Sequence, residues 1–510
     1  MLRAPSDTLT EPGMQLSLAL PELIVPSEGQ APPAPSDRSY CNRTLRLDQI
    51  EAVGFDMDYT LAIYHQEEMD RQSVLATLPK LLERGYPKAL RAMQCRFDYP
   101  IRGLLIDRKL GNVLKMDRYR YVKKAYHGLR ELTVEERRGA YHTKRLRPAM
   151  RRYHFVDTLY ALSEVSMFAA AVEALEAAGE AVDYTRLFDD IRTCIDQSHQ
   201  DGTILGPVLD DLPRFVARDP LLGPMLHKLR SAGKRLFLLT NSQPEYTDRM
   251  MSYLLADAMP QYPSWRSYFD VVVTAARKPG FFDGDAPFEE VVNGERRPVS
   301  SGKLERGHAY AGGNINAFHE ALKVTGDHVL YVGDHIYGDV LRAKKEGAWR
   351  TAMIIQEMDH ELQVIRSQKP ELARLAALDS QRVPLLDLIR EHQMRLKALQ
   401  RKLEDGGGGE ARLELEASKM RERRAIERFK AQLRGLELEA ETLERDLHRR
   451  FHPFWGPLFK AGAELSSFGD QVEEFACLYT ARASNLSFYS PMHYFQSPRD
   501  WMPHELRAGE

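Results

Sequence analysis

The chain has 510 residues, and 71 Lys and Arg against 73 Asp and Glu leave a formal net charge of −2. This length predicts two to four domains, and the even charge balance argues against a general nucleic-acid binder. The 4 cysteines form no C-x-x-C pair, which argues against a disulfide framework or a zinc knuckle. No apolar run approaches the roughly 18 residues of a membrane helix, and no signal-peptide pattern opens the chain. We therefore expect a cytoplasmic protein without membrane contact.

Residues 1–38 lack the apolar periodicity of a folded segment. Prolines interrupt the stretch throughout, and Gly, Ser and Gln fill the gaps. Such a composition cannot bury enough apolar surface to offset the chain entropy lost on folding. We expect a disordered tail here, with the folded protein beginning near residue 39.

Short apolar runs mark the strands of a parallel sheet. Apolar strands without in-out alternation, bounded by helices, are typical of parallel sheets that helices cover on both faces. The predicted fold class is therefore α/β, a doubly wound parallel sheet built from 39–64 and 226–375, with a large and mostly helical cap inserted at 65–225. The predicted strands lie, in chain order, at 50–55, 235–239, 270–274, 328–332 and 350–355.

The C-terminal third has a different periodicity. From Ile426 to Leu447 apolar residues recur in alternating steps of three and four, and Ile389, Leu396 and Leu403 are spaced by seven. This is the heptad pattern of packed helices, and the glycines at 406–409 separate its two halves. We expect a helical hairpin or coiled coil over 384–450. The aromatic-rich segment 451–510 is expected to pack on the core or on another subunit.

Acidic residues follow two of the predicted strands. Asp56 and Asp58 come directly after the first strand, and Asp334 and Asp339 follow the fourth. The carboxyl ends of strands are where open α/β sheets place their active sites. Paired carboxylates can supply a nucleophile and a general acid/base, and acidic oxygens facing Asp56 suit Mg²⁺.

Polar and cationic residues follow two further strands. Thr240 and Asn241 come after the second strand, where a hydroxyl and an amide can hydrogen-bond a phosphoryl oxygen. Lys278, beyond the third strand, is a point charge suited to a phosphoryl group or to the nucleophile's carboxylate. Each motif alone is also typical of an ordinary surface turn. Together, in this order and each at a strand end, the motifs indicate phosphoryl chemistry.

This combination resembles the haloacid dehalogenase (HAD) superfamily of aspartyl phosphotransferases. Longer segments are similar to the cytosolic purine 5′-nucleotidase family of the IMP/GMP-preferring type, and so is the ending at 454–491. The likeness spans roughly 40–505, apart from the expected hairpin. The other segments are NRTLRLDQIEAVGFDMDYTLAIY (42–64), RGLLIDRKLGNVLKMDR (102–118), TNSQPEYTDRMMSYLL (240–255) and YVGDHIYGDVLRAKKEGAWRT (331–351).

The resemblance implies a role for each catalytic motif. Asp56 would attack the 5′-phosphate to give an aspartyl-phosphate. Asp58 would protonate the leaving nucleoside oxygen and then activate the hydrolytic water. Thr240, Asn241 and Lys278 would bind the transferring phosphoryl group. If the intermediate can also pass to a nucleoside, the same site is a phosphotransferase.

The resemblance also implies a metal and an assembly. Asp56, Asp334 and the carbonyl of Asp58 would hold Mg²⁺, with Asp339 close by in support. The metal would neutralise charge so that an anionic carboxylate can approach an anionic phosphate. The family's habit implies a homo-oligomer, either a dimer or a tetramer.

The segment 188–199 resembles the family's base-recognition helix. Arg192 and Asp196 lie one helical turn apart on one face, with His199 nearby. They would read the O6/N1 edge of hypoxanthine or guanine, and Tyr160 would stack on the base. The alternatives are an intrahelical ion pair between Arg192 and Asp196 and a core position for Tyr160.

Two positions depart from the family's pattern. Leu205 stands where the family has a phosphate-side lysine, and Glu474 follows Gln471 where a Q-x-x-R is expected. The second change reverses a charge, which argues against activation by ATP-like effectors. Two alternatives to a purine nucleotidase remain: a phosphatase of other small phosphate esters, and a catalytically inactive HAD protein that acts as a coiled-coil scaffold.

Overall fold

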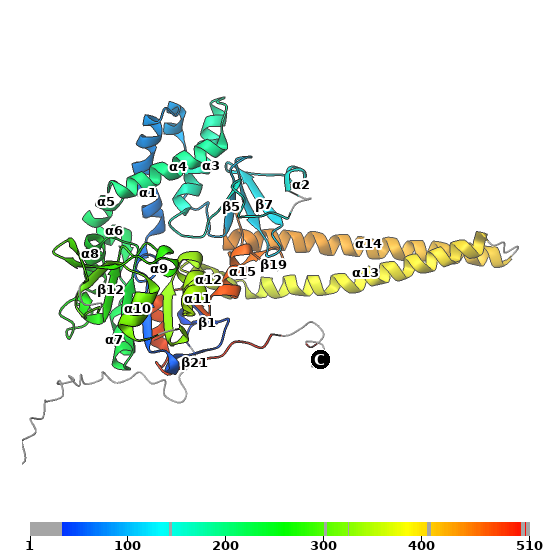
Figure 1. The fold of residues 1–510 in the computed structure, drawn as a ribbon. Helices are drawn as coiled ribbons and strands as arrows, with labels where there is room; N and C mark the ends of the chain where they lie inside the picture. The colour runs from blue at the N-terminus through cyan, green and yellow to red at the C-terminus, as the bar shows by residue number, and fades with distance from the viewer. Residues whose placement is uncertain are drawn as a thin grey trace, which may run out of the picture.

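The computed structural model describes residues 33–141, 145–299, 303–324, 326–404, 410–500 and 505. Most of the tail expected at 1–38, and the glycines at 406–409, lie outside these residues. A ten-stranded mixed sheet forms the centre of the molecule, and a long pair of helices projects from it (Figure 1).

Five parallel strands in the middle of this sheet are those that the sequence predicts. Their spatial order is β17-β16-β3-β11-β12, with β3 at the centre and parallel to both neighbours. The parallel core of the predicted fold is thus confirmed. The strands are β3 (Ala52–Phe55), β11 (Arg235–Leu239), β12 (Val271–Thr274), β16 (Val329–Gly333) and β17 (Arg350–Ile354).

Further strands widen the sheet on both sides. Two of them are parallel to the core, and the remaining three pair antiparallel at the edges. The parallel additions are β15 (Ala309–Gly312) and β20 (Leu478–Thr480), and the antiparallel ones are β1 (Tyr40–Cys41), β13 (Phe288–Val292) and β14 (Glu295–Pro298).

Alternate side chains of the central strands pack on opposite faces of the sheet. Leu236 and Leu238 of β11 belong to one apolar cluster, whereas Phe237 and Leu239 belong to another. Because both clusters include helical side chains, the sheet is buried on both faces, as in a doubly wound fold. The helices are α7 (Leu222–Ser231) and α8 (Pro244–Leu255) on the first face, and α9 (Gly280–Asp283), α10 (Ile315–Leu322) and α11 (Arg342–Gly347) on the second.

Gly54 in the central strand makes room for an aromatic ring. A Cβ at this position would lie 2.1 Å from Cζ of Phe237. That ring in turn packs edge-on against Trp349, with 5.7 Å between the ring centroids. The glycine therefore allows the central strand and its neighbour to pair beneath this aromatic cluster.

The insertion between β3 and α7 has a helical part and a sheet part. The helices α1 (Gln66–Glu83), α3 (Leu162–Ala177) and α4 (Tyr184–Gln200) agree with the expected helical cap. The sequence interpretation did not include the five-stranded antiparallel sheet of order β8-β7-β6-β5-β9. Its strands are β5 (Leu104–Asp107), β6 (Asn112–Met116), β7 (Val122–His127), β8 (Arg130–Glu131) and β9 (Tyr153–Phe155). Short elements complete the insertion: β4 (Ile63–Tyr64), α2 (Val134–Tyr141), α5 (Leu205–Asp210), α6 (Leu212–Phe215) and β10 (Val216–Ala217).

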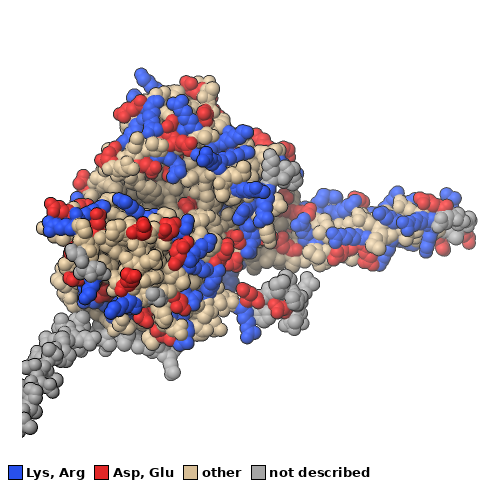
Figure 2. Space-filling view, viewed as in Figure 1, with Lys and Arg blue, Asp and Glu red and all other residues tan. Residues whose placement is uncertain are grey.

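The projecting pair consists of α13 (Lys369–Glu404) and α14 (Glu410–Phe451), which follow α12 (Met358–Ser367). Arg374 pairs with Glu439 and His392 with Glu422, so the two helices run antiparallel. The first helix begins at Lys369, before the expected start of the hairpin at 384. Pro384 therefore lies inside the helix and not at its start. Lys and Arg alternate with Asp and Glu along the exposed faces (Figure 2).

After the hairpin the chain returns to the core. It forms β18 (Lys460–Ala461), β19 (Glu464–Leu465) and α15 (Ser467–Phe475), and then adds β20 to the central sheet. Trp455 and Phe495 are buried, so this aromatic segment packs on its own core. The final strand β21 (Tyr494–Phe495) pairs with β2 (Leu45–Arg46). Within the described part of the chain, no helix has both the length and the apolar character that a bilayer crossing requires.

Candidate active site

The residues predicted at the strand ends meet at one edge of the sheet. Asp56 follows β3, Thr240 follows β11, and Asp334 follows β16. Carboxylate oxygens of Asp56, Asp334 and Asp339 all lie within 4.8 Å of one another. Because parallel strands end at a common edge, residues almost 300 positions apart in the sequence form a single cluster there.

Lys278 lies inside this carboxylate cluster. Its Nζ is 3.0 Å from Oδ2 of Asp56 and 2.6 Å from Oδ1 of Asp339. It also donates a hydrogen bond of 2.8 Å to the hydroxyl of Tyr331. Burial opposes the charged form, but the two carboxylates outweigh it and raise the pKa of Lys278. The ammonium therefore carries a positive charge next to the expected nucleophile.

The cluster contains three carboxyl groups and one ammonium group. Burial raises the pKa of Asp56 to about 7, although the positive charge of Lys278 acts in the opposite direction. Burial likewise raises the pKa of Asp334 well above its ordinary value. A cation bound between these carboxylates would favour their ionised forms. Three buried carboxylates with hard oxygen donors fit Mg²⁺, which prefers a few carboxylates together with water and phosphate oxygens.

A glycine and a π-helical turn place Asp339 in the cluster. Asp339 lies in the π-helix η6 (Ile336–Leu341), a kind of turn that often occurs at functional sites. A Cβ on Gly333 would lie 2.5 Å from Oδ2 of Asp339, so only glycine leaves space for this carboxylate. The backbone N–H of His335 donates to the same oxygen at 3.2 Å.

Asp58 is held by two hydroxyl groups. The Tyr64 hydroxyl donates to Oδ1 at 2.6 Å, and the Ser242 hydroxyl donates to Oδ2 at 2.5 Å. Tyr246 reaches the Tyr64 hydroxyl at 2.9 Å. Burial raises the pKa of Asp58, while the two hydroxyl donors lower it. Because a hydroxyl can either donate or accept, this environment accommodates both the ionised and the protonated carboxyl.

Thr240 and Asn241 take different positions. Thr240 is fully buried at the end of β11, and its hydroxyl accepts from the backbone N–H of Ser242 at 3.1 Å. The Asn241 side chain accepts from the backbone N–H of Lys278 at 2.6 Å and donates to its carbonyl at 3.0 Å. The amide of Asn241 thus holds the loop that carries Lys278.

The expected base-recognition residues lie in the cap, and Arg192 does not form the intrahelical ion pair with Asp196 that was the alternative interpretation. Tyr160 lies against His199, with ring centroids 4.4 Å apart. Arg192 reaches Glu164 at 3.2 Å, not Asp196. Burial first, and then the negative charges of Asp196 and Asp58, raise the pKa of Tyr160 well above its ordinary value.

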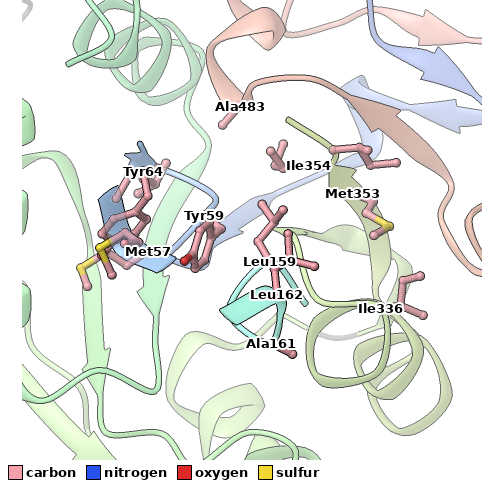
Figure 3. Close-up of a cluster of buried hydrophobic side chains, with 14 of the residues drawn as sticks. Met57, Tyr59, Tyr64, Leu159, Ala161, Leu162, Ile336, Met353, Ile354 and Ala483 are labelled. Atoms are coloured by element: carbon pink, nitrogen blue, oxygen red, sulfur yellow. The ribbon is translucent and has the colours of Figure 1, made fainter. Parts of the chain in front are cut away.

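Apolar packing joins the cap to the catalytic loop. Met57 and Tyr59 of the loop belong to the same buried cluster as Leu159 and Leu162 of the cap and Ile336 of the metal-side turn (Figure 3). Tyr59 has a positive φ of 56°, so the loop turns sharply where Asp58 leaves the strand. The cluster thus connects the cap to the loop that carries Asp56 and Asp58.

The family model of the 5′ nucleotidase family matches residues 39–507. The chain belongs to the 5′-nucleotidase family. This membership makes it a phosphoric monoester hydrolase of the nucleotidase type. The family predicted from the sequence motifs is thereby confirmed.

Curated relatives carry the same family name. A 5′-nucleotidase domain-containing protein of Dictyostelium discoideum is 29% identical over 477 residues, which cover 92% of this chain and 75% of that protein. The human 5′-nucleotidase domain-containing protein 2 is 29% identical over 348 residues, 65% of each chain. Its rat counterpart is 29% identical over 344 residues, 65% of this chain and 61% of that one. The chain therefore spans less than two thirds of these mammalian proteins.

Solved structures show a weaker likeness. A predicted phosphoglycolate phosphatase from Haemophilus somnus is 12% identical, over 60% of this chain and 85% of that one, with a TM-score of 0.26. A HAD-hydrolase of Bacillus subtilis bound to magnesium is also 12% identical, over 60% and 88%, with a TM-score of 0.20. Scores this low add nothing to the family assignment.

Several residues of the site were not among those predicted from the sequence. Tyr64, Ser242 and Glu164 contact a predicted site residue directly, and Tyr331 contacts Lys278. Tyr64 and Ser242 lie only a few positions from the motifs, so their place after a strand end was a usable signal. No spacing rule links Glu164 to Arg192, because their contact arises where two separate helices pack.

The two departures from the family's pattern lie in α5 and in α15. Leu205 begins α5, and Arg249 of the core helix α8 donates to the carbonyl of Leu209 in the same helix. Gln471 of α15 donates to the hydroxyl of Tyr337 at 3.3 Å, which places it beside the π-helical turn.

Proposed function

We propose that this protein is a Mg²⁺-dependent 5′-nucleotidase that hydrolyses purine nucleoside 5′-monophosphates such as IMP and GMP. One observation carries the proposal: Asp56 lies against Lys278 and within a carboxylate cluster, beneath a cap that bears aromatic and charged side chains. Membership of the 5′-nucleotidase family supports the reaction class. In keeping with the resemblance to cytosolic enzymes, we propose a cytoplasmic location and a homo-oligomeric assembly.

The reaction would proceed in two displacements. A carboxylate oxygen of Asp56 attacks phosphorus, and the bond from phosphorus to the nucleoside 5′-oxygen breaks. That oxygen takes a proton from Asp58, so the nucleoside leaves neutral. Asp58 then takes a proton from water, whose oxygen attacks phosphorus and releases phosphate from Asp56. If a nucleoside hydroxyl replaces the water, the same step transfers the phosphoryl group.

The other residues stabilise charge and position the reactants. Lys278 offsets the charge that develops on the phosphoryl oxygens, while Thr240 borders the same edge. Asp56, Asp334 and the Asp58 carbonyl would hold Mg²⁺, with Asp339 in support. When bound, the metal neutralises the phosphate so that an anionic nucleophile can approach it.

Tyr160 supports the choice of a purine. Tyr160 is 38% exposed and its ring lies beside His199, and we propose that a base stacks on this pair of rings. Arg192, oriented by Glu164, and Asp196 supply a donor and an acceptor for the O6/N1 edge of hypoxanthine or guanine.

The test is a phosphate-release screen over nucleoside monophosphates, with Mg²⁺ and with a chelator. We expect release from IMP and GMP that requires the metal and that falls by at least 1,000-fold, as an order of magnitude, in Asp56→Asn. Release from sugar phosphates but not from nucleotides would contradict the substrate and retain the chemistry. Equal release by wild type and Asp56→Asn would contradict the catalytic role and favour the scaffold.

A further inference from the structure

Arg102 is a buried arginine outside the predicted catalytic set. Its side chain has 0% exposure, although it lies just before β5 at the start of the cap sheet. A guanidinium is rarely buried in this way unless its donors are all used. Its contacts therefore show what the charge does in this protein.

The guanidinium connects the metal-side loop to the end of β17. It donates to the backbone carbonyl of Asp334 at 2.9 Å and lies 4.0 Å from Oδ2 of the same residue. On its other edge it forms a bidentate pair with Glu357, at 2.8 and 2.7 Å. Bidentate pairs of this kind fix the orientation of the guanidinium plane.

The C-terminal segment closes the remaining side. Arg102 lies over the ring of Phe468 in α15, 5.1 Å from its centroid. The next residue, Gly103, has a positive φ of 85°, and a Cβ there would lie 2.5 Å from the Cβ of Phe468. The close approach of α15 thus requires glycine, and it shields the arginine from solvent.

We infer that Arg102 is a positioning residue that fixes Asp334 for metal binding. The hydrogen bond to the Asp334 carbonyl holds the peptide plane from which that carboxylate projects toward Asp56 and Asp339. Arg102 makes no contact with a nucleophile or an acid/base in the described structure, so its effect acts through the metal ligand. This inference rests on the proposed metal-dependent function.

The experiment measures metal affinity directly. Mn²⁺, which carboxylates bind much as they bind Mg²⁺, is titrated into the full-length protein and the free-ion EPR signal is followed, with Mg²⁺ as competitor. We expect Arg102→Lys to weaken Mn²⁺ binding by about 10- to 100-fold, the usual effect of losing a residue that orients a ligand. Lysine retains the charge but cannot reach the carbonyl and Glu357 together.

A matched control separates positioning from general damage. Arg152 also forms a bidentate pair with a buried carboxylate of the cap sheet, Asp107, at 2.8 and 2.5 Å. Arg152→Lys should lose similar stability and keep the wild-type affinity for Mn²⁺. Glu357→Gln retains Arg102 but weakens the bidentate pair that orients it, so this variant should also have a lower Mn²⁺ affinity. It provides the test if Arg102→Lys does not fold.

The outcomes distinguish this inference from the proposed function. Wild-type protein that binds no Mn²⁺ and releases no phosphate overturns the proposed function and the inference with it. A second outcome is that the wild-type protein binds Mn²⁺ and that the folded Arg102→Lys and Glu357→Gln proteins bind it with an affinity within twofold of wild type. This outcome overturns only the role of Arg102. A lower Mn²⁺ affinity in both variants, together with wild-type affinity in Arg152→Lys, supports the positioning role of Arg102.

Discussion

At the scale of single residues, Asp58 shows how neighbouring hydroxyl groups fix the orientation of a catalytic carboxyl. Both of its carboxylate oxygens accept a hydroxyl hydrogen bond, one from Tyr64 and one from Ser242. Such restraint fixes the direction in which the carboxyl can deliver a proton. It also means that the orientation of Asp58 depends on Tyr64 and Ser242, which were not among the residues predicted from the sequence.

We predict that Tyr64→Phe lowers kcat for IMP about tenfold and leaves KM nearly unchanged. The variant removes one hydrogen bond to the Asp58 carboxyl, worth roughly 1.4 kcal/mol, and this converts to about tenfold in rate. Steady-state kinetics measure both constants. Tyr246→Phe is the matched control, because its hydroxyl reaches Tyr64 but not Asp58 in the described structure. If Tyr246→Phe lowered kcat more than Tyr64→Phe does, the direct hydrogen bond from Tyr64 to Asp58 would not be the cause of the effect.

Asp70 of α1 provides a test by pH. It is 2% exposed, it accepts from Gln66 at 2.9 Å, and its second oxygen has no hydrogen-bond partner among the described residues. Burial raises its pKa to about 8. Between about pH 4 and pH 8 the unfolded chain therefore releases this proton while the folded protein keeps it, so wild-type stability falls as pH rises.

We predict that Asp70→Asn gains stability relative to wild type between pH 5 and pH 7.5. The asparagine does not titrate, so the difference should grow by up to about 1.4 kcal/mol per pH unit. Thermal unfolding midpoints of both proteins at the two pH values measure it. Parallel pH dependences for the two proteins would show that the carboxyl does not titrate in this window.

The sequence was informative where a residue's neighbours are set by strand ends. Asp56, Lys278 and Asp334 follow three strands of one parallel sheet, so their meeting at one edge could be predicted. The partner of Arg192 could not be predicted in this way. The i,i+4 spacing indicates Asp196 as its neighbour, whereas the packing of α3 on α4 brings Glu164 into contact with it. Arg102 likewise gives no local signal, since its contacts come from three distant segments.

At the scale of elements, Gly54 links the central strand to its neighbour. We predict that Gly54→Ala destabilises the protein by about 1–3 kcal/mol, since its Cβ would meet the Phe237 ring at 2.1 Å. Adding Phe237→Leu should recover part of this loss, with a coupling of about 1 kcal/mol or more in a double-mutant cycle. Unfolding free energies of the single and double variants provide the measurement.

A second glycine is the control for that prediction. Gly435 lies inside α14, and a Cβ there would meet no atom within 4 Å. Gly435→Ala should therefore raise stability by about 0.5–1 kcal/mol through helix propensity. A loss in Gly435→Ala would mean that alanine itself, and not contact with Phe237, explains the result at Gly54.

Elements with a strong apolar pattern were predicted, and weakly patterned ones were not. The five central strands are continuous apolar runs, so their type is evident from the sequence. The strands of the cap sheet are short, and β7 contains two lysines. Their signal lies in the turns instead: Gly111 and Gly128 both have positive φ and separate antiparallel neighbours. The hairpin was expected to begin at 384, yet its first helix, α13, already begins at Lys369 and continues through Pro384.

At the scale of the whole molecule, the hairpin extends far from the catalytic edge. Its helices have 36 and 42 residues, which at 1.5 Å per residue gives about 54 to 63 Å. In the described structure, the ion pairs and ring contacts of 383–436 are all made within the hairpin. Its distal part is therefore energetically separate from the core.

We predict that excising 383–436 leaves catalysis intact. Arg382 and Glu437 face each other at 3.5 Å across the hairpin, so a short Gly/Ser loop can join them. The kcat/KM for IMP should stay within twofold of wild type, because the base of the hairpin and its contacts to α12 remain. Light scattering of both proteins shows whether assembly also survives. A loss of activity by more than tenfold would contradict the separation of hairpin and core.

The route of the chain through the sheet has a consequence during synthesis. β17 is complete at residue 354, but its outer neighbour β20 begins only at residue 478, after the hairpin. A ribosome adding roughly 5–20 residues per second needs about 6 to 25 s to make this interval. For that time the nascent sheet exposes an unpaired edge, which is a site for wrong pairing. Phe468 is absent for most of the same interval, so Arg102 stays uncovered until α15 has been made.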